Sequence, residues 1–278
     1  MQRLPFGVAR IDSILQGGAP PGSTLLLAGE SGAAARDFAQ TAAAMNALYD
    51  ADADLFDLYY GDLPANAETP PSVHYLSFTA DQTEIAREMG YTMDEAVVDV
   101  VSDEIQFRDF SPEYFQLSSI PREWYIGQAS TIEDLGKRQG TDDVLSALGD
   151  YLSKHAAGNL VVIDSISDIV GAMGGDIEWS DVTTLLKGLT KASHSWDGLI
   201  LLLVNTDILT DTEYGQLMDA SEGTFEFTWE SGGSQRARTM IVRQFRGVLS
   251  QLEEENIVRF ETEIHEGGFD ISDVRKIR

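Results

Sequence analysis

Short apolar runs alternate with longer stretches of mixed polarity along the chain. The runs are continuous, which is typical of strands buried on both faces of a parallel sheet. Between them, apolar residues recur at helical spacing, as at Phe38, Ala42 and Met45. The pattern predicts an α/β protein with a mostly parallel central sheet and helices on both faces. The expected strands are Ser23–Ala28, Val73–Phe78, Leu160–Ser165 and Leu199–Val204, and the expected helices are about 33–49 and 82–90.

A different pattern begins near Phe225. The stretch TFEFTWE alternates polar and apolar residues, Gly232 and Gly233 provide a turn, and RARTMIVRQFRG follows. Two such stretches around a glycine turn are typical of an antiparallel hairpin. We therefore expect a C-terminal antiparallel hairpin.

The composition is that of a soluble α/β protein. The 278 residues contain no linker rich in Pro, Gly or Ser, which predicts a single domain over 1–278. The longest apolar run, Leu199–Val204, is too short to span a bilayer, and no basic segment followed by an apolar one marks the N-terminus. We expect a cytoplasmic protein with no membrane partner.

Metal and disulfide chemistry have little support in the sequence. The chain has no Cys, which excludes disulfides and thiolate metal sites. The histidines stand far apart and lack ligand spacing, so we interpret them as structural or solvated; they are His74, His155, His194 and His265.

Acidic residues dominate the charge. Asp and Glu outnumber Lys and Arg by 46 to 19, giving a formal net charge of -27. Molar salt screens such a charge, because it shortens the Debye length to about 3 Å. We interpret the acidity as adaptation to a halophilic cytoplasm. It also makes nucleic acid an unlikely partner, since Lys and Arg supply most non-specific affinity for phosphates.

An acidic insertion is expected at about 50–72, with the sequence DADADLFDLYYGDLPANAETPPS. One interpretation is a partner-binding loop whose aromatic residues are partly exposed. The other, which we favour, is a surface loop whose apolar residues pack against the domain.

The stretch LLLAGESGAAARDFAQ has the layout of a strand, a phosphate-binding loop and a helix. In the loop G-x-x-x-x-G-K-[ST], backbone N–H groups hold phosphates, the Lys neutralises them and the hydroxyl binds Mg²⁺. Here the second Gly, the Lys and the hydroxyl residue are replaced by Ala34, Ala35 and Arg36. The candidate site is therefore a vestigial phosphate loop, formed by Gly29, Glu30, Ser31, Gly32, Ala33, Ala34, Ala35 and Arg36.

Several segments, in their order, resemble the KaiC-like domain family of the RecA superfamily, which has the RadA/KaiC-type P-loop ATPase fold. A run of the form Gly-Val-x-x-Ile-Asp-x-Ile-Leu-x-Gly-Gly precedes the loop. The segments HYLSFTAD, NLVVIDSIS, LILLLVNTD, RTMIVRQFRG and FETEIHEGGFDI follow it. The resemblance covers nearly the whole chain and implies a RecA-like three-layer fold. Relatives form rings with nucleotide between subunits, so a homo-oligomer is one expectation.

The resemblance also implies where catalytic groups would stand. Adjacent Glu residues that activate the attacking water correspond here to Thr79 and Ala80, neither of which can act as a general base. Asp81 is a weak candidate to replace them, because one residue along the chain redirects the side chain. The catalytic Glu is thus missing, and we expect no catalytic residue.

Asp164 ends the run LVVID and resembles the Walker B carboxylate, which makes it a vestigial metal ligand. Arg36 stands at the position of the metal-binding hydroxyl. We therefore predict an ion pair between Arg36 and Asp164 in the place of the metal, the alternative being two solvated side chains.

Basic residues gather in the expected hairpin. In the family, a Lys and an Arg there reach a neighbouring subunit's ATP; these positions read Gln244 and Arg246, so the resemblance implies an intersubunit anion contact for Arg246 alone. With Arg236, Arg238 and Arg243 it could form an anion site. Our preferred interpretation is that these residues neutralise carboxylates on the sheet edge.

Three functions compete. The first is a catalytically inactive KaiC/RecA-like pseudo-ATPase that acts as a regulatory or protein-interaction module, with an unidentified protein partner and no bound cofactor. The second is an ATP-binding KaiC/RadA-type ATPase with an altered active site, in which weak binding of ATP or another anion persists. The third, a nucleic-acid-handling recombinase relative, is disfavoured by the net charge of -27.

Overall fold

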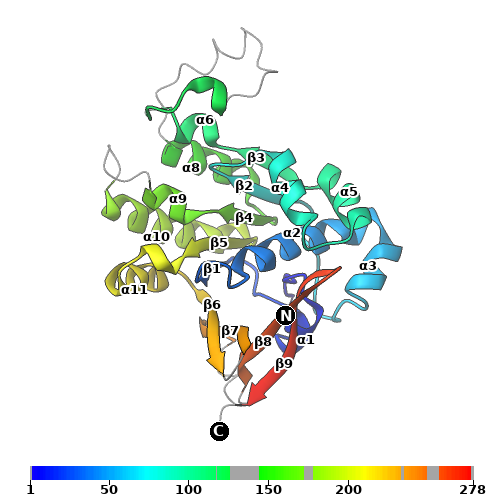
Figure 1. Ribbon diagram of the computed structural model, residues 1–278. Helices are drawn as coiled ribbons and strands as arrows, with labels where there is room; N and C mark the ends of the chain where they lie inside the picture. Colours follow the sequence, from blue (N-terminus) through cyan, green and yellow to red (C-terminus); the bar gives the residue numbers. More distant parts are fainter. Residues whose placement is uncertain are drawn as a thin grey trace.

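The computed structural model describes residues 2–116, 118–125, 144–171, 178–232, 235–248 and 257–276. Its centre is a nine-stranded sheet in the order β3-β2-β4-β5-β1-β6-β7-β8-β9 (Figure 1). The strands from β3 through β6 in this order pair in parallel, and β6 through β9 pair antiparallel. The strands are β1 Ser23–Gly29, β2 Val73–Ser77, β3 Gln106–Asp109, β4 Leu160–Asp164, β5 Leu199–Asn205, β6 Gly223–Gly232, β7 Gln235–Phe245, β8 Ile257–His265 and β9 Gly268–Lys276.

Helices cover both faces of the sheet, as Figure 1 shows. On one face lie α1 Ala9–Ile14, α2 Ala35–Ala51, α3 Ala53–Tyr59, α4 Gln82–Met89 and α5 Glu95–Glu104. On the other lie α8 Val144–His155, α9 Ile166–Gly171, α10 Trp179–Trp196 and α11 Asp211–Ala220. Shorter elements are α6 Ser111–Tyr114 and the 3-10 turns η1 Arg122–Trp124 and η2 Thr206–Ile208.

Alternation along the strands separates two cores. In β1, Leu25 and Leu27 face the core under α1 to α5, whereas Leu26 and Ala28 face the core under α8 to α11. All of β1 is buried, because helices cover it from both sides. The fold is therefore the predicted three-layer α/β arrangement of the RecA type.

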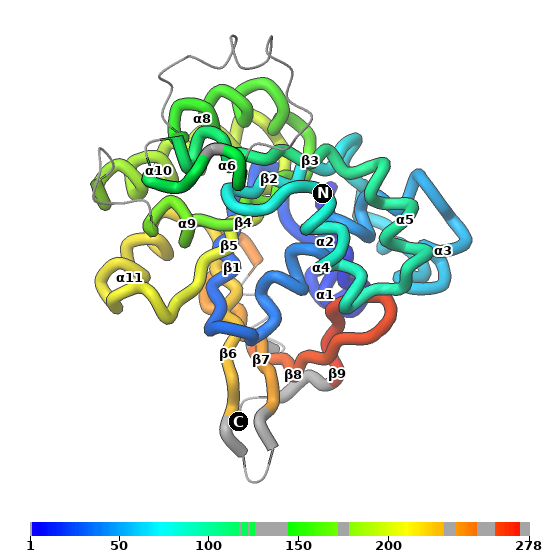
Figure 2. The backbone as a smooth tube through the Cα atoms, turned by 45° about the horizontal axis from the view of Figure 1, so that its top comes forward, coloured from blue at the N-terminus to red at the C-terminus, as the bar shows by residue number. Residues whose placement is uncertain are grey.

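The expected C-terminal hairpin is formed by β6 and β7, and Gly233 of its expected turn lies outside the described residues. The sheet continues further than predicted, through a second hairpin of β8 and β9. Thr41 of α2 helps to dock this hairpin, because its hydroxyl accepts a hydrogen bond from the Phe269 N–H at 2.8 Å. Figure 2 shows the antiparallel strands extending from the rest of the sheet.

The predicted strands are confirmed to within a residue, while the first helix is displaced. The helix expected at about 33–49 begins at Ala35 and runs to Ala51. It cannot begin earlier, because Ala34 has a φ of 78°, in the left-handed region. The helix expected at about 82–90 is α4, and Asp81 provides its capping box with Glu84.

The interpretation of 50–72 as a loop is wrong for its first part, which completes α2 and forms α3. Asp52 caps α3 by accepting hydrogen bonds from the Asp54 and Leu55 N–H groups. Phe56 stacks on Tyr60 at 4.7 Å between ring centroids, and both are buried. Leu58 is 69% exposed. Phe56 and Tyr60 thus pack inward, whereas Leu58 faces solvent.

Among the described helices, none combines the length and apolar character that crossing a bilayer requires.

Candidate functional site

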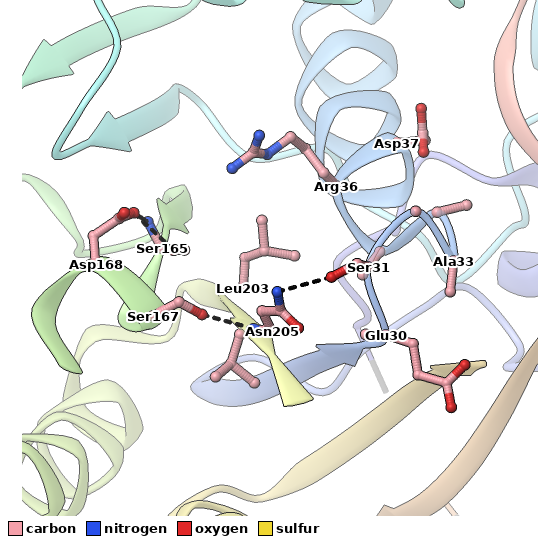
Figure 3. A pocket seen from close by; sticks show the side chains of 15 residues that line it. Glu30, Ser31, Ala33, Arg36, Asp37, Ser165, Ser167, Asp168, Leu203 and Asn205 are labelled. Carbon is pink, nitrogen blue, oxygen red and sulfur yellow. Dashed lines mark hydrogen bonds between the residues drawn. The ribbon is translucent and has the colours of Figure 1, made fainter. Parts of the chain in front are cut away.

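A cleft of about 430 Å³ opens at the carboxyl ends of the parallel strands. The loop from Gly29 to Asp37 lines one side, and residues that follow β4 or end β5 line the other, namely Ser165, Ser167, Asp168, Leu203, Val204 and Asn205 (Figure 3). This edge is where open α/β sheets bind ligands, since loops and helix N-termini converge there. The structure therefore brings the whole predicted loop together in one cleft.

The loop keeps its compact shape without the second glycine of the motif. Ala34 adopts a φ of 78° and Gly32 a φ of 75°. A Cβ on Gly29 would lie 2.6 Å from the Cβ of Ala35, so only glycine fits there. The curvature that follows directs backbone N–H groups into the cleft at the N-terminus of α2.

Part of the hydrogen-bonding capacity of the loop is used internally. The Ser31 N–H donates to Asp207 Oδ2 at 2.9 Å, and the Ala33 N–H donates to the Glu30 carbonyl at 3.0 Å. Within the described part of the chain, the N–H groups of Gly32, Ala34, Ala35 and Arg36 have no partner, whereas the Asp37 N–H donates to its own side-chain carboxylate. The loop thus retains donors at the positive end of α2.

Neighbouring strands hold the tip of the loop from both sides. On the β5 side, the Asn205 amide donates to Ser31 Oγ at 3.1 Å. On the β6 side, the Trp229 indole donates to the Ser31 carbonyl at 3.1 Å, and the Trp229 N–H donates to Glu30 Oε2 at 2.9 Å. These contacts fix the loop against the ends of the sheet.

The predicted pair between Arg36 and Asp164 is confirmed. Arg36 Nη2 lies 2.9 Å from Asp164 Oδ1, and Figure 3 shows Arg36 reaching from α2 toward the β4 side of the cleft. Tyr75 of β2 donates its hydroxyl to Asp164 Oδ2 at 2.7 Å. Glu88 of α4 adds a longer contact, 3.8 Å from Arg36 Nη1. Both oxygens of Asp164 are therefore engaged by side chains of this protein.

Burial makes this network firm on one side. Asp164 is 6% exposed and Tyr75 is fully buried. Burial, followed by the charge of Asp164, raises the pKa of the Tyr75 hydroxyl well above its usual value, so the phenol stays protonated and remains a donor. Half of the Arg36 side chain is exposed. The Asp164 carboxylate is thus held by Tyr75 on its buried side and by the Arg36 guanidinium on the cleft side.

These residues do not fit a Mg²⁺ site. Magnesium requires free oxygen ligands in octahedral geometry, usually shared with substrate phosphates. Asp164 has both oxygens in hydrogen bonds, and a guanidinium occupies the neighbouring position. Across the described residues, no group of three or more His, Cys, Asp or Glu side chains could hold a metal ion.

Carboxylates dominate the surroundings of the cleft. Glu30, Asp37 and Asp168 line it, and Arg36 is the only basic residue among its described lining residues. Burial raises the pKa of Asp37 and that of Asp168, and for Asp168 the charge of Asp164 adds to this effect. The cleft therefore has carboxylates on both sides, with Glu30 and Asp37 on the loop side and Asp168 on the side opposite the loop.

The other predicted site positions lie elsewhere or do other work. Thr79 and Ala80 follow β2, where their N–H groups contact Ser77 Oγ at 3.4 and 3.1 Å, and neither residue lines the cleft. Asp81 is engaged as the cap of α4, accepting from the Glu84 N–H at 2.9 Å. It is thus not free to act as the replacement base considered above.

Among the described arginine side chains of the hairpin, Arg238 and Arg243 each have a separate partner. Arg243 Nε contacts Glu226 Oε2 at 2.6 Å, which agrees with charge neutralisation on the sheet. Arg238 lies over the Trp229 ring at 5.1 Å. Arg246 is exposed and does not line the cleft, and the side chain of Arg236 lies outside the described residues.

Two groups at the loop were not predicted. Asp207, which binds the Ser31 N–H, stands just after the strand LILLLVN, so its position near the cleft was available from the sequence. Trp229 could not have been found, because its contact with the loop depends on β6 pairing with β1.

No protein-family model and no curated protein matches the sequence. Solved structures do match it over nearly its full length. A KaiC-like protein from the hyperthermophilic archaeon Pyrococcus horikoshii aligns with a TM-score of 0.62 at 16% identity, covering 98% of this chain and 99% of that chain. The flagellar accessory protein FlaH from Methanocaldococcus jannaschii aligns with a TM-score of 0.58 at 14% identity, covering 95% and 96%. At such identities the similarity shows the fold alone, which this chain shares with these two proteins.

Proposed function

We propose that this chain is a KaiC-like pseudo-ATPase, which has lost nucleotide turnover and acts as a regulatory or protein-interaction module in the cytoplasm. The observation that carries the proposal is the ion pair of Arg36 with Asp164 at 2.9 Å, on the carboxylate that resembles Walker B. An internal cation here replaces the external one that an active site would need. The replacement of the phosphate-binding residue types by Ala34, Ala35 and Arg36 agrees with this proposal.

Charge supports the proposal independently. Phosphoryl transfer depends on cations that neutralise the transferred group, usually a loop Lys and Mg²⁺. Position 35 carries a methyl group, and Arg36 is already paired with Asp164. A polyphosphate would in addition approach the carboxylates of Glu30 and Asp168, which line the cleft. The described side chains therefore favour exclusion of nucleotide over activation of it.

The chain also lacks a side chain that could activate the attacking water. Thr79 and Ala80 offer no carboxylate, and Asp81 is engaged as a helix cap. A positioned general base typically contributes about 10²–10⁴ in rate. Losses in phosphate binding, metal binding and water activation act on separate steps, so restoring one of them would not restore turnover.

The alternative is an ATP-binding protein with an altered site. The cleft of about 430 Å³ and the unpartnered N–H groups at the start of α2 favour it. Under this alternative, ATP would bind through backbone donors alone. Its binding should then be weak and independent of Mg²⁺.

Isothermal titration with ATP at molar salt, with and without Mg²⁺, separates the two proposals, and phosphate release tests turnover. For the pseudo-ATPase we expect no binding and no release, whereas weak binding that is unaffected by Mg²⁺ would favour the alternative. Steady release on the order of 1 s⁻¹ would contradict the pseudo-ATPase proposal.

A restored loop provides the matched comparison. The triple variant Ala34→Gly, Ala35→Lys and Arg36→Ser returns the residue types of the phosphate motif and frees Asp164. We expect it to gain Mg²⁺-dependent ATP affinity while remaining without turnover, because Thr79 and Ala80 are unchanged. The single variant Arg87→Ala, at an exposed position of α4, serves as the control for general surface effects.

A further inference from the structure

The histidines of this chain fall into two classes that the sequence did not separate. His194 Nε2 lies 3.1 Å from Glu222 Oε1, and His265 Nε2 lies 3.6 Å from Asp270 Oδ2. His74 and His155 have no such carboxylate among the described residues. They contact each other instead, with ring centroids 5.4 Å apart, although they stand far apart in the sequence.

A tyrosine completes this cluster. Tyr151 of α8 places its hydroxyl 3.0 Å from His74 Nδ1, and its ring centroid lies 4.5 Å from that of His155. Tyr151 and His155 are one helical turn apart, so they present a continuous surface toward β2. His74 is 5% exposed, whereas His155 is exposed. The cluster thus joins the last turn of α8 to the buried second residue of β2.

The charged groups around the cluster do not favour imidazolium. From β3, Arg108 faces Tyr151, and it is already paired with Glu113 of α6 at 2.5 Å. On α8 itself, Lys154 is exposed and precedes His155. From β4, Val161 is the register partner of His74 and carries no charge. Two adjacent imidazolium groups would therefore repel each other without a nearby carboxylate to compensate.

We propose that His74, Tyr151 and His155 form a proton-sensitive clasp, which holds the C-terminal end of α8 on β2 while the His74 imidazole is neutral and loosens it when that imidazole is protonated. His74 stands near the start of β2, whereas the cleft lies at the opposite ends of the strands. The clasp is therefore separate from the phosphate loop and does not depend on its function.

The sign of the effect follows from burial. Burial, and next the charge of His155, lowers the pKa of His74 below its usual value. The folded protein then binds fewer protons at His74 than the unfolded chain. The stabilisation is fully present above the unfolded value, about 6.5, and is lost as the pH falls through the lower folded value.

Imidazole NMR titration at constant molar salt tests the coupling. We expect His74 to titrate below the ordinary histidine value of about 6.5, and its midpoint to rise in the variant His155→Gln, because the neighbouring charge is gone. The matched control His194→Gln should leave the His74 midpoint unchanged. Equal midpoints of His74 in the wild type and in His155→Gln would overturn the proposal.

Hydrogen exchange tests the release. Between about pH 7.5 and pH 5, after correction for intrinsic rates, we expect amide protection over the last turn of α8 to fall relative to that of α10, because protonation of His74 favours opening of this end of the helix. Tyr151→Phe, which removes the hydrogen bond while keeping the ring, should lower protection in α8 at neutral pH. Protection of α8 that follows that of α10 at every pH would show that no clasp opens.

Discussion

At the scale of single residues, the pair of Arg36 and Asp164 decides how the cleft behaves. A carboxylate that is 6% exposed needs partners, and here Tyr75 and Arg36 provide them. Removing one side chain leaves the charge of the other without a partner, whereas removing both charges leaves no charge that needs a partner. The pair therefore has a testable energetic signature that does not depend on the function of the protein.

We expect Arg36→Ala to lower the free energy of unfolding by about 1–2 kcal/mol, less than the roughly 3–5 kcal/mol typical of a broken buried pair, because half of the Arg36 side chain is exposed. The double variant with Asp164→Asn should lose less than the sum of the single variants. Denaturant melts of a double-mutant cycle measure this coupling. Additive losses would mean that the two side chains do not stabilise each other.

Asp12 is a second residue with an unusual environment. It is fully buried, accepts a hydrogen bond from the Phe6 N–H at 2.6 Å, and accepts another from the Tyr60 hydroxyl at 3.0 Å. Burial is the largest influence and raises the pKa of Asp12 to about 7, against the opposing effect of these hydrogen bonds. The residue links the N-terminal segment and α1 to the end of α3.

A raised pKa means that the folded protein binds more protons at Asp12 than the unfolded chain. Its contribution to stability is thus present below the ordinary value of 3.8 and is lost as the pH rises through about 7. The variant Asp12→Asn should remove this dependence. The stability of the wild type relative to the variant should therefore fall between about pH 4 and pH 8, by up to about 4 kcal/mol. Melting curves at constant molar salt measure it, and a constant difference would contradict the assignment.

Sequence reasoning reached some of these residues and missed others for a physical reason. Arg36 and Asp164 were predictable as partners because both positions belong to motifs whose relative placement the fold fixes. The contacts of Asp12 with Tyr60 and of His74 with His155 join segments that no motif relates. Such pairs depend on how helices pack, and neither spacing nor composition determines that packing.

At the scale of elements, the turn between β1 and α2 combines two requirements. It must bend sharply at Gly29, and it must begin a helix that is buried along much of its length. Ala34 is suited to the start of the buried helix, but the bend forces it into the left-handed region with a φ of 78°. A non-glycine residue in this region typically costs roughly 1–2 kcal/mol.

The variant Ala34→Gly should therefore stabilise the protein by about 0.5–1 kcal/mol, because relief of this strain exceeds the added entropy of the unfolded chain. Ala33→Gly is the matched control, since Ala33 is also buried but does not have a positive φ. We expect the control to destabilise by about 0.5–1 kcal/mol. Chemical denaturation of both variants measures the difference, and equal effects of the two substitutions would argue against strain at Ala34.

The elements that the sequence revealed are those with the strongest patterns. Continuous apolar runs predicted the parallel strands, because a strand that is buried on both faces accommodates few polar side chains. The short helix α3 was missed, since its seven residues hold one buried side chain, Phe56, and depend on the Asp52 cap and on ring stacking. The second hairpin, β8 with β9, was missed because its sequence mixes charged and apolar residues and its position depends on docking against Thr41.

At the scale of the whole molecule, the cleft and the histidine cluster lie at opposite ends of the strands of one sheet. The cleft lies where β1, β4 and β5 end, and the histidine cluster lies where β2 begins. Helices of the face that carries α8 to α11 lie at both ends, since α9 borders the cleft and α8 carries Tyr151 and His155. The response of the histidine cluster to pH and the response of the cleft to substitutions in the loop can therefore be measured separately.

Net charge is the property that acts on the molecule as a whole. A formal charge of -27 repels itself over a Debye length of about 30 Å at 0.01 M salt, but over only about 3 Å near 1 M. The ion pairs described above neutralise few of the 46 acidic side chains. The folded state, which is more compact than the unfolded chain, should lose stability as salt is removed.

We therefore expect the melting temperature, followed by circular dichroism, to rise continuously as sodium chloride increases from about 0.01 M to above 1 M. Neutralising exposed carboxylates on α5, with Asp99→Asn, Asp103→Asn and Glu104→Gln, should raise the melting temperature most at low salt and make its salt dependence shallower. The comparison matters because salt also strengthens hydrophobic burial, which would act equally on the wild type and on this variant. Parallel salt curves for the two proteins would assign the effect to burial instead of charge. A melting temperature that does not rise with salt would show that the acidity is not an adaptation to salt.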